Sequence, residues 1–154
     1  MNTVTAVDRL EGYKNALAEA KIPYDGTLVA NGHYSRAESA KSAAKLLAID
    51  PRPTAIYASN DIMAIGVMDV IKEKNLRVPE DCSVIGSDNI DLAQFTSPAL
   101  TSVNMPIYEI SRAAVRLLFE VIGGKSINGN GRQVMDTHLV ARNSCSHPPL
   151  PSGE

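Results

Sequence analysis

Residues 53–89 read "PTAIYASNDIMAIGVMDVIKEKNLRVPEDCSVIGSDN", with two short apolar segments on either side of a helical pattern. The first segment, TAIYA (54–58), and the second, CSVIGS (82–87), have the length of buried strands, and residues 61–74 have the length of a helix. Strands that alternate with helices at this spacing pair in parallel through right-handed crossovers. The stretch therefore predicts an α/β fold with a doubly wound parallel sheet.

The same alternation extends to both sides of this stretch. Ser35 and Glu38 have the spacing of a capping box, and Pro51 and Pro53 end the helix that Ser35 begins. The other elements are expected, in chain order, to be a helix at 5–20, a strand at 27–31, a helix from 36 to about 49, a short extended segment at 100–103, a helix at 106–122 and a strand at 132–143.

Composition narrows the class of protein. The chain has 154 residues, 44% of them hydrophobic and 21% charged, with a net charge of −2, which fits one soluble domain and argues against a nucleic-acid-binding surface on this chain. Cys82 and Cys145 are far apart and predict no disulfide framework. No apolar run approaches the roughly 20 residues that span a bilayer, and the first residues lack the pattern of a signal peptide. We therefore expect a cytoplasmic protein without membrane contact.

Polar residues follow three of the predicted strands. They are Asn31 to Tyr34, Ser59 to Asp61, and Ser87 to Asn89. In open α/β sheets, ligands bind beyond the carboxyl ends of the strands. One Asn or Asp at such a place is usually a cap or a turn residue, but three polar ends on one edge favour a binding site. Amides and carboxylates together suit a ligand that carries hydroxyls or ring nitrogens.

Catalytic and metal sites are not predicted. His33, Ser87 and Asp88 include the residue types of a hydrolytic triad, but the G-x-S-x-G elbow is missing. Asp61 and Asp91 could join Asp88 around a cation, but no strand end has two adjacent acids. Phosphate-binding glycine loops are also missing, and the histidines and cysteines lack the spacing of metal ligands. No enzyme activity, cofactor or metal is therefore expected.

The predicted helix at 61–74 is apolar on most of its sides. One side can pack on the sheet, and the other needs a partner, either within the domain or from a second chain. We favour a homodimer because a domain of this size rarely covers both faces of a helix. The residues expected at the dimer interface are Ile62, Ile65, Met68 and Ile71.

Four segments together resemble the effector-binding region of the LacI/GalR family of transcriptional regulators. They are RLEGYKNALAEAKIPYD, residues 53–89, SPALTSVNMP and LVARNS, and the resemblance covers residues 8–144 in order. It implies a periplasmic-binding-protein-like fold of two lobes. Residues 5–103 would form the second lobe without its first strand, 104–124 a helix of the other lobe, 132–143 a returning strand, and 144–154 a tail. The helix-turn-helix that binds operator DNA in the family is not expected in this chain.

The resemblance also implies the contacts with the effector. Arg9 would reach polar groups, Tyr34 would stack on a ring, Asn60 would bind hydroxyls, and Asp88 matches the first of two family acids. Asn89 replaces the second acid. The two other departures from the family are Ser87, in place of an aromatic residue, and Met105, in place of a polar one. Asp61 is expected to complement the helix dipole rather than to bind the ligand.

The expected function is therefore that of a sensor. The chain would be the effector-sensing and dimerisation part of a LacI-type regulator, binding a small sugar-like or purine-like molecule that controls operator binding. The alternative is a periplasmic-type solute-binding module for sugar transport. A small α/β enzyme is the third possibility.

Overall fold

A four-stranded sheet in the order β1-β2-β3-β4 forms the centre of the protein. The computed structural model describes residues 3–125 and 133–147. Strands β1 (Ala55–Tyr57), β2 (Ser83–Asp88) and β3 (Thr101–Asn104) are parallel, and β4 (His138–Val140) runs antiparallel to β3. The predicted α/β class with a parallel-dominated sheet is confirmed. Because the three strands are parallel, their carboxyl ends share one edge of the sheet.

Four α-helices surround or leave this sheet: α1 (Val4–Glu19), α2 (Arg36–Leu46), α3 (Asp61–Glu73) and α4 (Ile107–Ile122). Side-chain oxygens of Thr3, Ser35 and Asn60 accept hydrogen bonds from the first turns of α1, α2 and α3. The end of α3 is marked by Asn75, whose φ of 58° is the left-handed conformation that stops a helix. Local capping chemistry therefore sets the start of α1, α2 and α3 and the end of α3.

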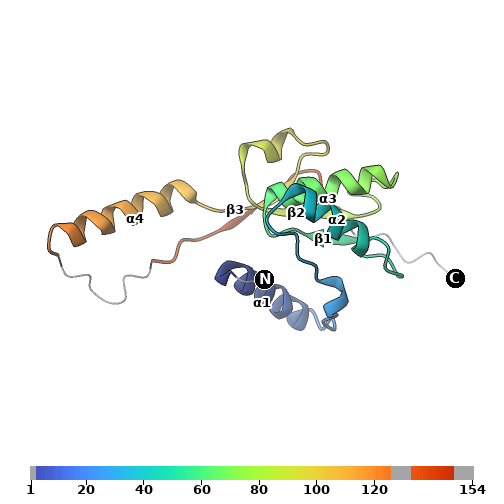
Figure 1. Cartoon of the computed structure of the whole chain (residues 1–154), viewed down its shortest axis with the longest axis horizontal. Coiled ribbons are helices and arrows are strands. Elements are labelled where there is room, and N and C mark those ends of the chain that lie inside the picture. Colours follow the sequence, from blue (N-terminus) through green and yellow to red (C-terminus); the bar gives the residue numbers. More distant parts are fainter. Residues whose placement is uncertain (1–2, 126–132, 148–154) are drawn as a thin grey trace.

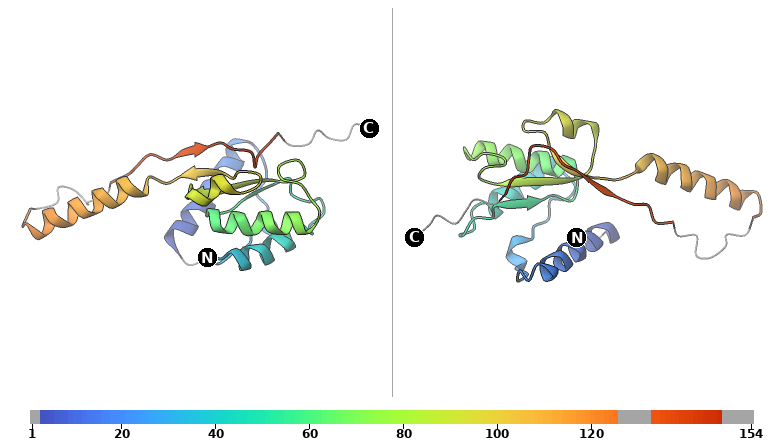
Figure 2. Two further views of the ribbon diagram at one scale, coloured as in Figure 1. Left: turned by 90° about the horizontal axis from the view of Figure 1, so that it is seen from above. Right: turned by 180° about the vertical axis from the view of Figure 1, so that it is seen from behind.

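Helix α3 packs on β2, and α2 packs on α3 (Figure 2). The two helices come close because Gly66 has no side chain, and a Cβ atom there would collide with the backbone of Arg36 and the hydroxyl of Ser39. The hydrophobic core lies between these layers and includes residues that are fully or almost fully buried. They are Ala43, Leu47, Ile56, Ala64, Val67, Ile71, Cys82, Val84 and Leu100.

Helix α4 projects away from the rest of the lobe (Figure 1). Its apolar residues are largely exposed, including Tyr108 at 74% and Phe119 at 69%. The assignment of α4 to a second lobe stays a prediction, and the exposed apolar stripe is compatible with it.

The strand predicted at 27–31 is wrong. A short 3-10 helix, η1 (Gly26–Leu28), begins the segment, and Val29 has an extended backbone without a ladder partner. An extended segment becomes a strand only when a neighbour pairs with it, and the edge of β1 that faces this segment is open. A cleft of about 170 Å³ separates α1, residues 28–30 and β1.

The predicted strand at 132–143 is much shorter than expected. Pairing is limited to β4, between Ser102↔Val140 and Asn104↔His138. The ladder stops there because β3 itself ends at Asn104, two residues before Pro106 caps α4. Residue 132 lies outside the described residues.

The tail predicted at 144–154 begins later than expected. Ser144 is fully buried. Its hydroxyl donates to the carbonyl of Val84 at 2.6 Å and accepts from the N–H of Thr101 at 2.8 Å, so it joins β2 to β3. Residues 148–154 of the predicted tail lie outside the described residues.

Candidate functional site

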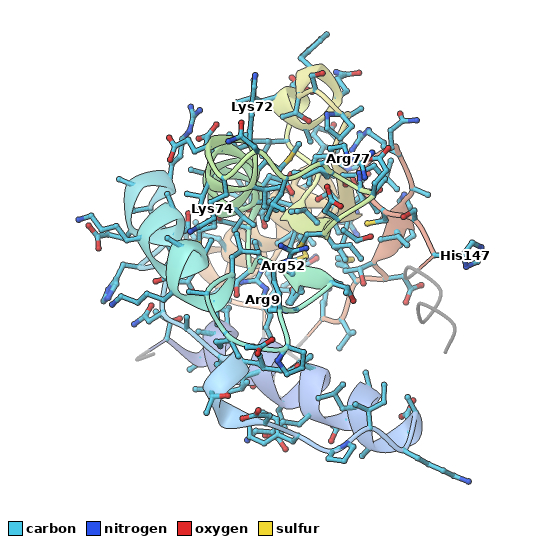
Figure 3. All side chains as sticks on the ribbon, turned by 90° about the vertical axis from the view of Figure 1, so that its right-hand side faces the viewer. Arg9, Arg52, Lys72, Lys74, Arg77 and His147 are labelled. Atoms are coloured by element: carbon cyan, nitrogen blue, oxygen red, sulfur yellow. The ribbon has the colours of Figure 1, made fainter. Side chains whose placement is uncertain are left out.

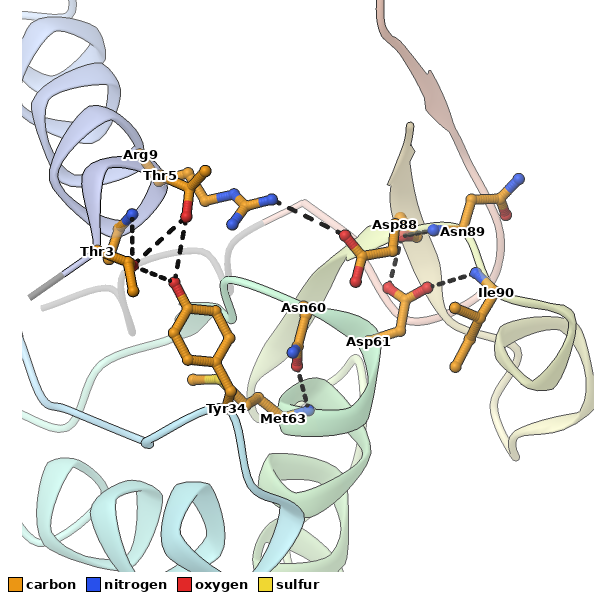
Figure 4. A network of polar contacts seen from close by, with 12 residues as sticks. Thr3, Thr5, Arg9, Tyr34, Asn60, Asp61, Met63, Asp88, Asn89 and Ile90 are labelled. Atoms are coloured by element: carbon orange, nitrogen blue, oxygen red, sulfur yellow. Dashed lines mark hydrogen bonds and ion pairs between the residues drawn. The ribbon is translucent and has the colours of Figure 1, made fainter. Parts of the chain in front are cut away.

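The residues implied by the resemblance gather at the carboxyl edge of the sheet (Figure 4). Asp88 ends β2, Asn60 lies between β1 and α3, and Tyr34 precedes α2. Arg9 reaches the same place from α1, which lies next to the open edge of β1 (Figures 1 and 4). Four side chains from separate parts of the sequence thus meet at one edge. The parallel strand ends account for Asn60 and Asp88, while Arg9 comes from α1 and Tyr34 from the segment before α2.

Arg9 and Asp88 face each other across this edge. The Nη2 of Arg9 lies 3.8 Å from the Oδ1 of Asp88, and their side chains are 23% and 33% exposed. Burial raises the pKa of Asp88, the charge of Arg9 lowers it, and the nearby Asp61 raises it further. The pair is accessible and longer than a direct hydrogen bond, so both groups keep hydrogen-bonding capacity for a ligand.

Tyr34 is tied to the start of α1. Its hydroxyl lies 2.8 Å from the Oγ1 of Thr3 and 3.4 Å from that of Thr5. These hydrogen bonds, that of Thr3 first, lower the pKa of Tyr34. The side chain remains 44% exposed, and the backbone has a φ of 54°, which is uncommon outside glycine. The ring therefore has a fixed position and an open surface on which a flat ligand can stack.

The structure gives Asn60 and Asp61 roles that differ in part from those that the sequence predicts. The Oδ1 of Asn60 accepts from the N–H of Met63 at 2.8 Å, so Asn60 is the cap of α3. Within the described residues its Nδ2 donates to no protein atom, which leaves that group for a ligand. Asp61 is completely buried. It accepts from the hydroxyl of Ser102 at 2.6 Å and from the N–H of Ile90 at 2.8 Å.

The sequence places Asn89 at a strand end but does not predict its contacts with Asn104 and Arg142. Asn89 is bonded to Asn104 and Arg142, and these three side chains join β2, β3 and the segment after β4. All three lie in segments that carry the family resemblance: Asn89 ends residues 53–89, Asn104 lies in SPALTSVNMP, and Arg142 lies in LVARNS. Contacts across such distances in sequence leave no local pattern.

Helix α3 is covered mainly by its own chain. Ile71 is fully buried, Ile65 and Met68 are 7% and 8% exposed, and only Ile62 has a large exposed surface, at 39%. Of the two alternatives for the second face of α3, cover within the domain therefore applies to most of the helix, because α2 and β2 cover it. Homodimerisation itself stays a prediction. Ile65 and Met68 still border a surface groove with Thr96, Ser97 and Pro98.

The structure gives little support for a hydrolytic triad or a metal site. Ser87 is 2% exposed, which hides the hydroxyl of the considered triad. The described residues contain no cluster of three or more His, Cys, Asp or Glu side chains that suits a metal ion. No helix in the described part of the chain has the length and apolarity to cross a membrane. The basic side chains Lys72, Arg9 and His147 lie at separate places on the lobe (Figure 3).

A family described as "Periplasmic binding protein-like domain" matches residues 2–145. The chain belongs to this family. Among the relatives of this periplasmic-binding-protein-like domain, the transcriptional repressor CytR of Escherichia coli K12 is 40% identical over 136 residues, which are 88% of this chain and 40% of the repressor. The repressor PurR of Vibrio atlanticus is 38% identical over 138 residues, which are 90% of this chain and 40% of that protein. The chain thus spans about two-fifths of these curated relatives.

Solved structures give the same result for this periplasmic-binding-protein-like chain. A complex of the transcriptional regulator CelR with cellobiose superimposes with a TM-score of 0.89 at 35% identity, over 94% of this chain and 44% of that one. CcpA of Lactococcus lactis gives 0.87 at 34% identity, over 95% and 53%. A sugar-binding LacI-family regulator from Escherichia coli gives 0.85 at 36%, over 96% and 52%. The predicted resemblance to LacI-type effector-binding domains is confirmed, and the relatives are regulators rather than transport proteins.

Proposed function

We propose that the chain is the effector-sensing and dimerisation part of a LacI-type transcriptional regulator. The observation that carries the proposal is the approach of Arg9 and Asp88 to 3.8 Å at the carboxyl edge of the sheet, with Tyr34 and Asn60 beside them (Figure 4). A guanidinium, a carboxylate, a free amide N–H and an aromatic face are complementary to a small polar molecule with hydroxyls or ring nitrogens. A sugar-like or nucleobase-like effector fits this set.

In the proposed mechanism, the effector inserts between Arg9 and Asp88 and replaces their ion pair. This changes the position of α1 relative to the end of β2, and the binding energy shifts the regulator between two conformations. Coupling of this kind typically amounts to about 1–3 kcal/mol. Operator DNA would be bound by a helix-turn-helix elsewhere in the regulator, in the cytoplasm, and none of the four site residues would touch DNA.

A titration with cellobiose and with adenosine tests the site. We expect the backbone and side-chain resonances of Arg9, Tyr34, Asn60 and Asp88 to shift together at millimolar ligand, because the described groups contact the ligand from one side. Arg9→Ala removes the fork that binds the ligand and should abolish the shifts while the melting temperature stays within a few degrees. Arg116→Ala, on exposed α4, is the matched control and should bind as the original chain does.

The result that contradicts the proposed function is equally specific. Shifts that are absent for both ligands, or that persist unchanged in Arg9→Ala, would place the effector site elsewhere. Shifts confined to the cleft between α1 and β1, which Arg9 also lines, with Tyr34, Asn60 and Asp88 unchanged, would have the same consequence.

Homodimerisation is proposed through the surface that α3 still exposes. Ile62 supports this as an exposed isoleucine on α3, and so does the groove at Thr96–Pro98, in which Ile65 and Met68 of the same helix lie among charged side chains. Ile62→Glu should lower the sedimenting mass from dimer to monomer. Ile22→Glu, at an isoleucine that is 53% exposed after α1, is the control and should remain a dimer. Equal masses for both variants would exclude this interface.

A further inference from the structure

Asp88 and Asn89 adopt two consecutive backbone conformations that non-glycine residues avoid. Their φ angles are 115° and 55°. Such conformations persist only where the surrounding structure holds them in place, and they gather at functional sites. Here they form the turn that directs the carboxylate of Asp88 toward Arg9 at the edge of the sheet (Figure 4).

Three hydrogen bonds hold Asn89, and each comes from a different residue. Its N–H donates to the hydroxyl of Ser102 at 3.0 Å, its Nδ2 donates to the Oδ1 of Asn104 at 2.9 Å, and its Oδ1 accepts from the Nη2 of Arg142 at 2.7 Å. The amide therefore uses both its donor and its acceptor. In this arrangement Asn89 donates to the Oδ1 of Asn104, and an acid at position 89 could bond Asn104 only if that amide turned to present its Nδ2.

The partners of Asn89 lie next to the two connections between the lobe and α4, one at the end of β3 and the other just after β4, the strand that follows α4. Asn104 ends β3, directly before the residues that lead into α4. Arg142 follows β4 on the returning segment and is itself anchored, with its Nη1 donating to the carbonyl of Leu100 at 2.7 Å and its N–H to the hydroxyl of Thr101 at 2.9 Å. One side-chain amide thus joins the turn at Asp88 to both connections.

We propose that Asn89 is a positioning residue that fixes the carboxylate of Asp88 at the effector site and couples it to the two connections with α4. The coupling rests on the proposed function, in which Asp88 contacts the effector. The amide can satisfy Asn104 and Arg142 together in only one arrangement of the three segments. A displacement of either connection therefore reaches Asp88, and a ligand on Asp88 biases both connections by the same coupling.

Glycine substitution separates the side chain from the backbone strain. Asn89→Gly permits the positive φ without cost but removes both side-chain bonds. Asn75→Gly is the matched control, because Asn75 has a φ of 58° and its side chain makes no hydrogen bond within the described residues. Asn89→Leu is the second variant: it keeps a side chain of similar size and removes both side-chain bonds.

Amide hydrogen exchange of the ligand-free 154-residue chain gives the first readout. In Asn89→Gly we expect exchange at residues 139–143 to accelerate at least tenfold, with α2 unchanged. Asn75→Gly should leave these amides unchanged, and Asn89→Leu should accelerate exchange at both 104–107 and 139–143. Equal exchange at 139–143 in Asn89→Gly and Asn75→Gly would overturn the proposal. If Asn89→Gly fails to fold, an original exchange pattern in Asn89→Leu overturns it instead.

The carboxyl carbon resonance of Asp88 gives a second readout that a purely structural role would not change. In the original chain burial raises the pKa of Asp88, with Arg9 and Asp61 as the charged neighbours. In Asn89→Gly the carboxylate should turn to solvent and titrate closer to its ordinary value, and an unchanged titration contradicts the positioning role. Neither readout needs a ligand. A negative titration with cellobiose and adenosine therefore counts against the proposed function alone.

Discussion

The carboxylate of Asp61 and the hydroxyl of Ser102 form a hydrogen bond of 2.6 Å, and both side chains are completely buried. Asp61 begins α3 and Ser102 lies in the middle of β3, so this bond joins the central helix to the sheet. The carboxylate can approach because β2 has Gly86 at the point of contact, where a Cβ atom would collide with it. A buried acid of this kind is stable only with its partners in place.

Removing Asp61 should therefore destabilise the protein strongly. Asp61→Ala leaves the Ser102 hydroxyl and the Ile90 N–H without an acceptor, which we expect to cost about 3 kcal/mol. Ser102→Ala removes one of the two bonds to Asp61 and also the acceptor of the Asn89 N–H, and it should cost about 2 kcal/mol. Urea denaturation measures both. Asp8→Ala, at an exposed site on α1, is the control and should change stability by less than about 0.5 kcal/mol. Similar losses for Asp61→Ala and Asp8→Ala would contradict this assignment.

Two glycines in helices should respond to alanine in opposite directions. Gly66→Ala places a Cβ atom against the backbone of Arg36, which must push α2 away from α3 and should cost about 2 kcal/mol or more. Gly12→Ala meets no atom within 4 Å and should stabilise α1 by about 1 kcal/mol through helix propensity. Thermal unfolding followed by circular dichroism compares the pair. A neutral Gly66→Ala would mean that the two helices do not cross as closely as described.

Cys82 should make stability fall in alkaline solution. Burial raises the pKa of its thiol to about 11 from the ordinary value of 9.0. The folded protein therefore holds this proton between pH 9 and pH 11 while the unfolded chain releases it, so stability decreases as pH rises through this window. Cys82→Ala should remove this part of the slope, and urea midpoints at pH 8 and pH 10.5 measure it. Cys145→Ala, at the partly exposed free thiol, is the control. An identical slope in Cys82→Ala would contradict the assignment.

The open edge of β1 should be visible in amide exchange. Thr54 and Ala58 bond to β2, and the register of β1 places Ile56 on the same side. By the alternation of a parallel ladder, the N–H groups of Ala55 and Tyr57 point away from β2 into the cleft beside α1. We expect Ile56 to exchange at least a hundredfold more slowly than Ala55 and Tyr57. Equal protection of all three amides would show that the cleft is closed in solution.

Much of the fold follows from the sequence because its causes are local. The apolar strands before Asn60 and Asp88, the capping oxygens of Ser35 and Asn60, and the left-handed Asn75 are all signals within a few residues. The parallel order of the strands then brings their carboxyl ends to one edge, so the place of the candidate site was also predictable. The resemblance of these segments to LacI-type regulators also predicts Arg9 and Tyr34 as residues of the site.

Only the tertiary structure decided which hydrogen-bond partner each polar side chain has. Asn60 has its acceptor on α3, Asp61 is buried against Ser102, and Asn89 is fixed by Arg142, which lies 53 residues further along the chain. The extended backbone at Val29 did not become a strand, since pairing depends on a neighbour and not on the residue itself. Helix α3 is covered mainly by α2 of the same chain. The physical reason is common to all of these cases: burial and hydrogen-bond partners come from segments far apart in sequence, whose meeting no local pattern records.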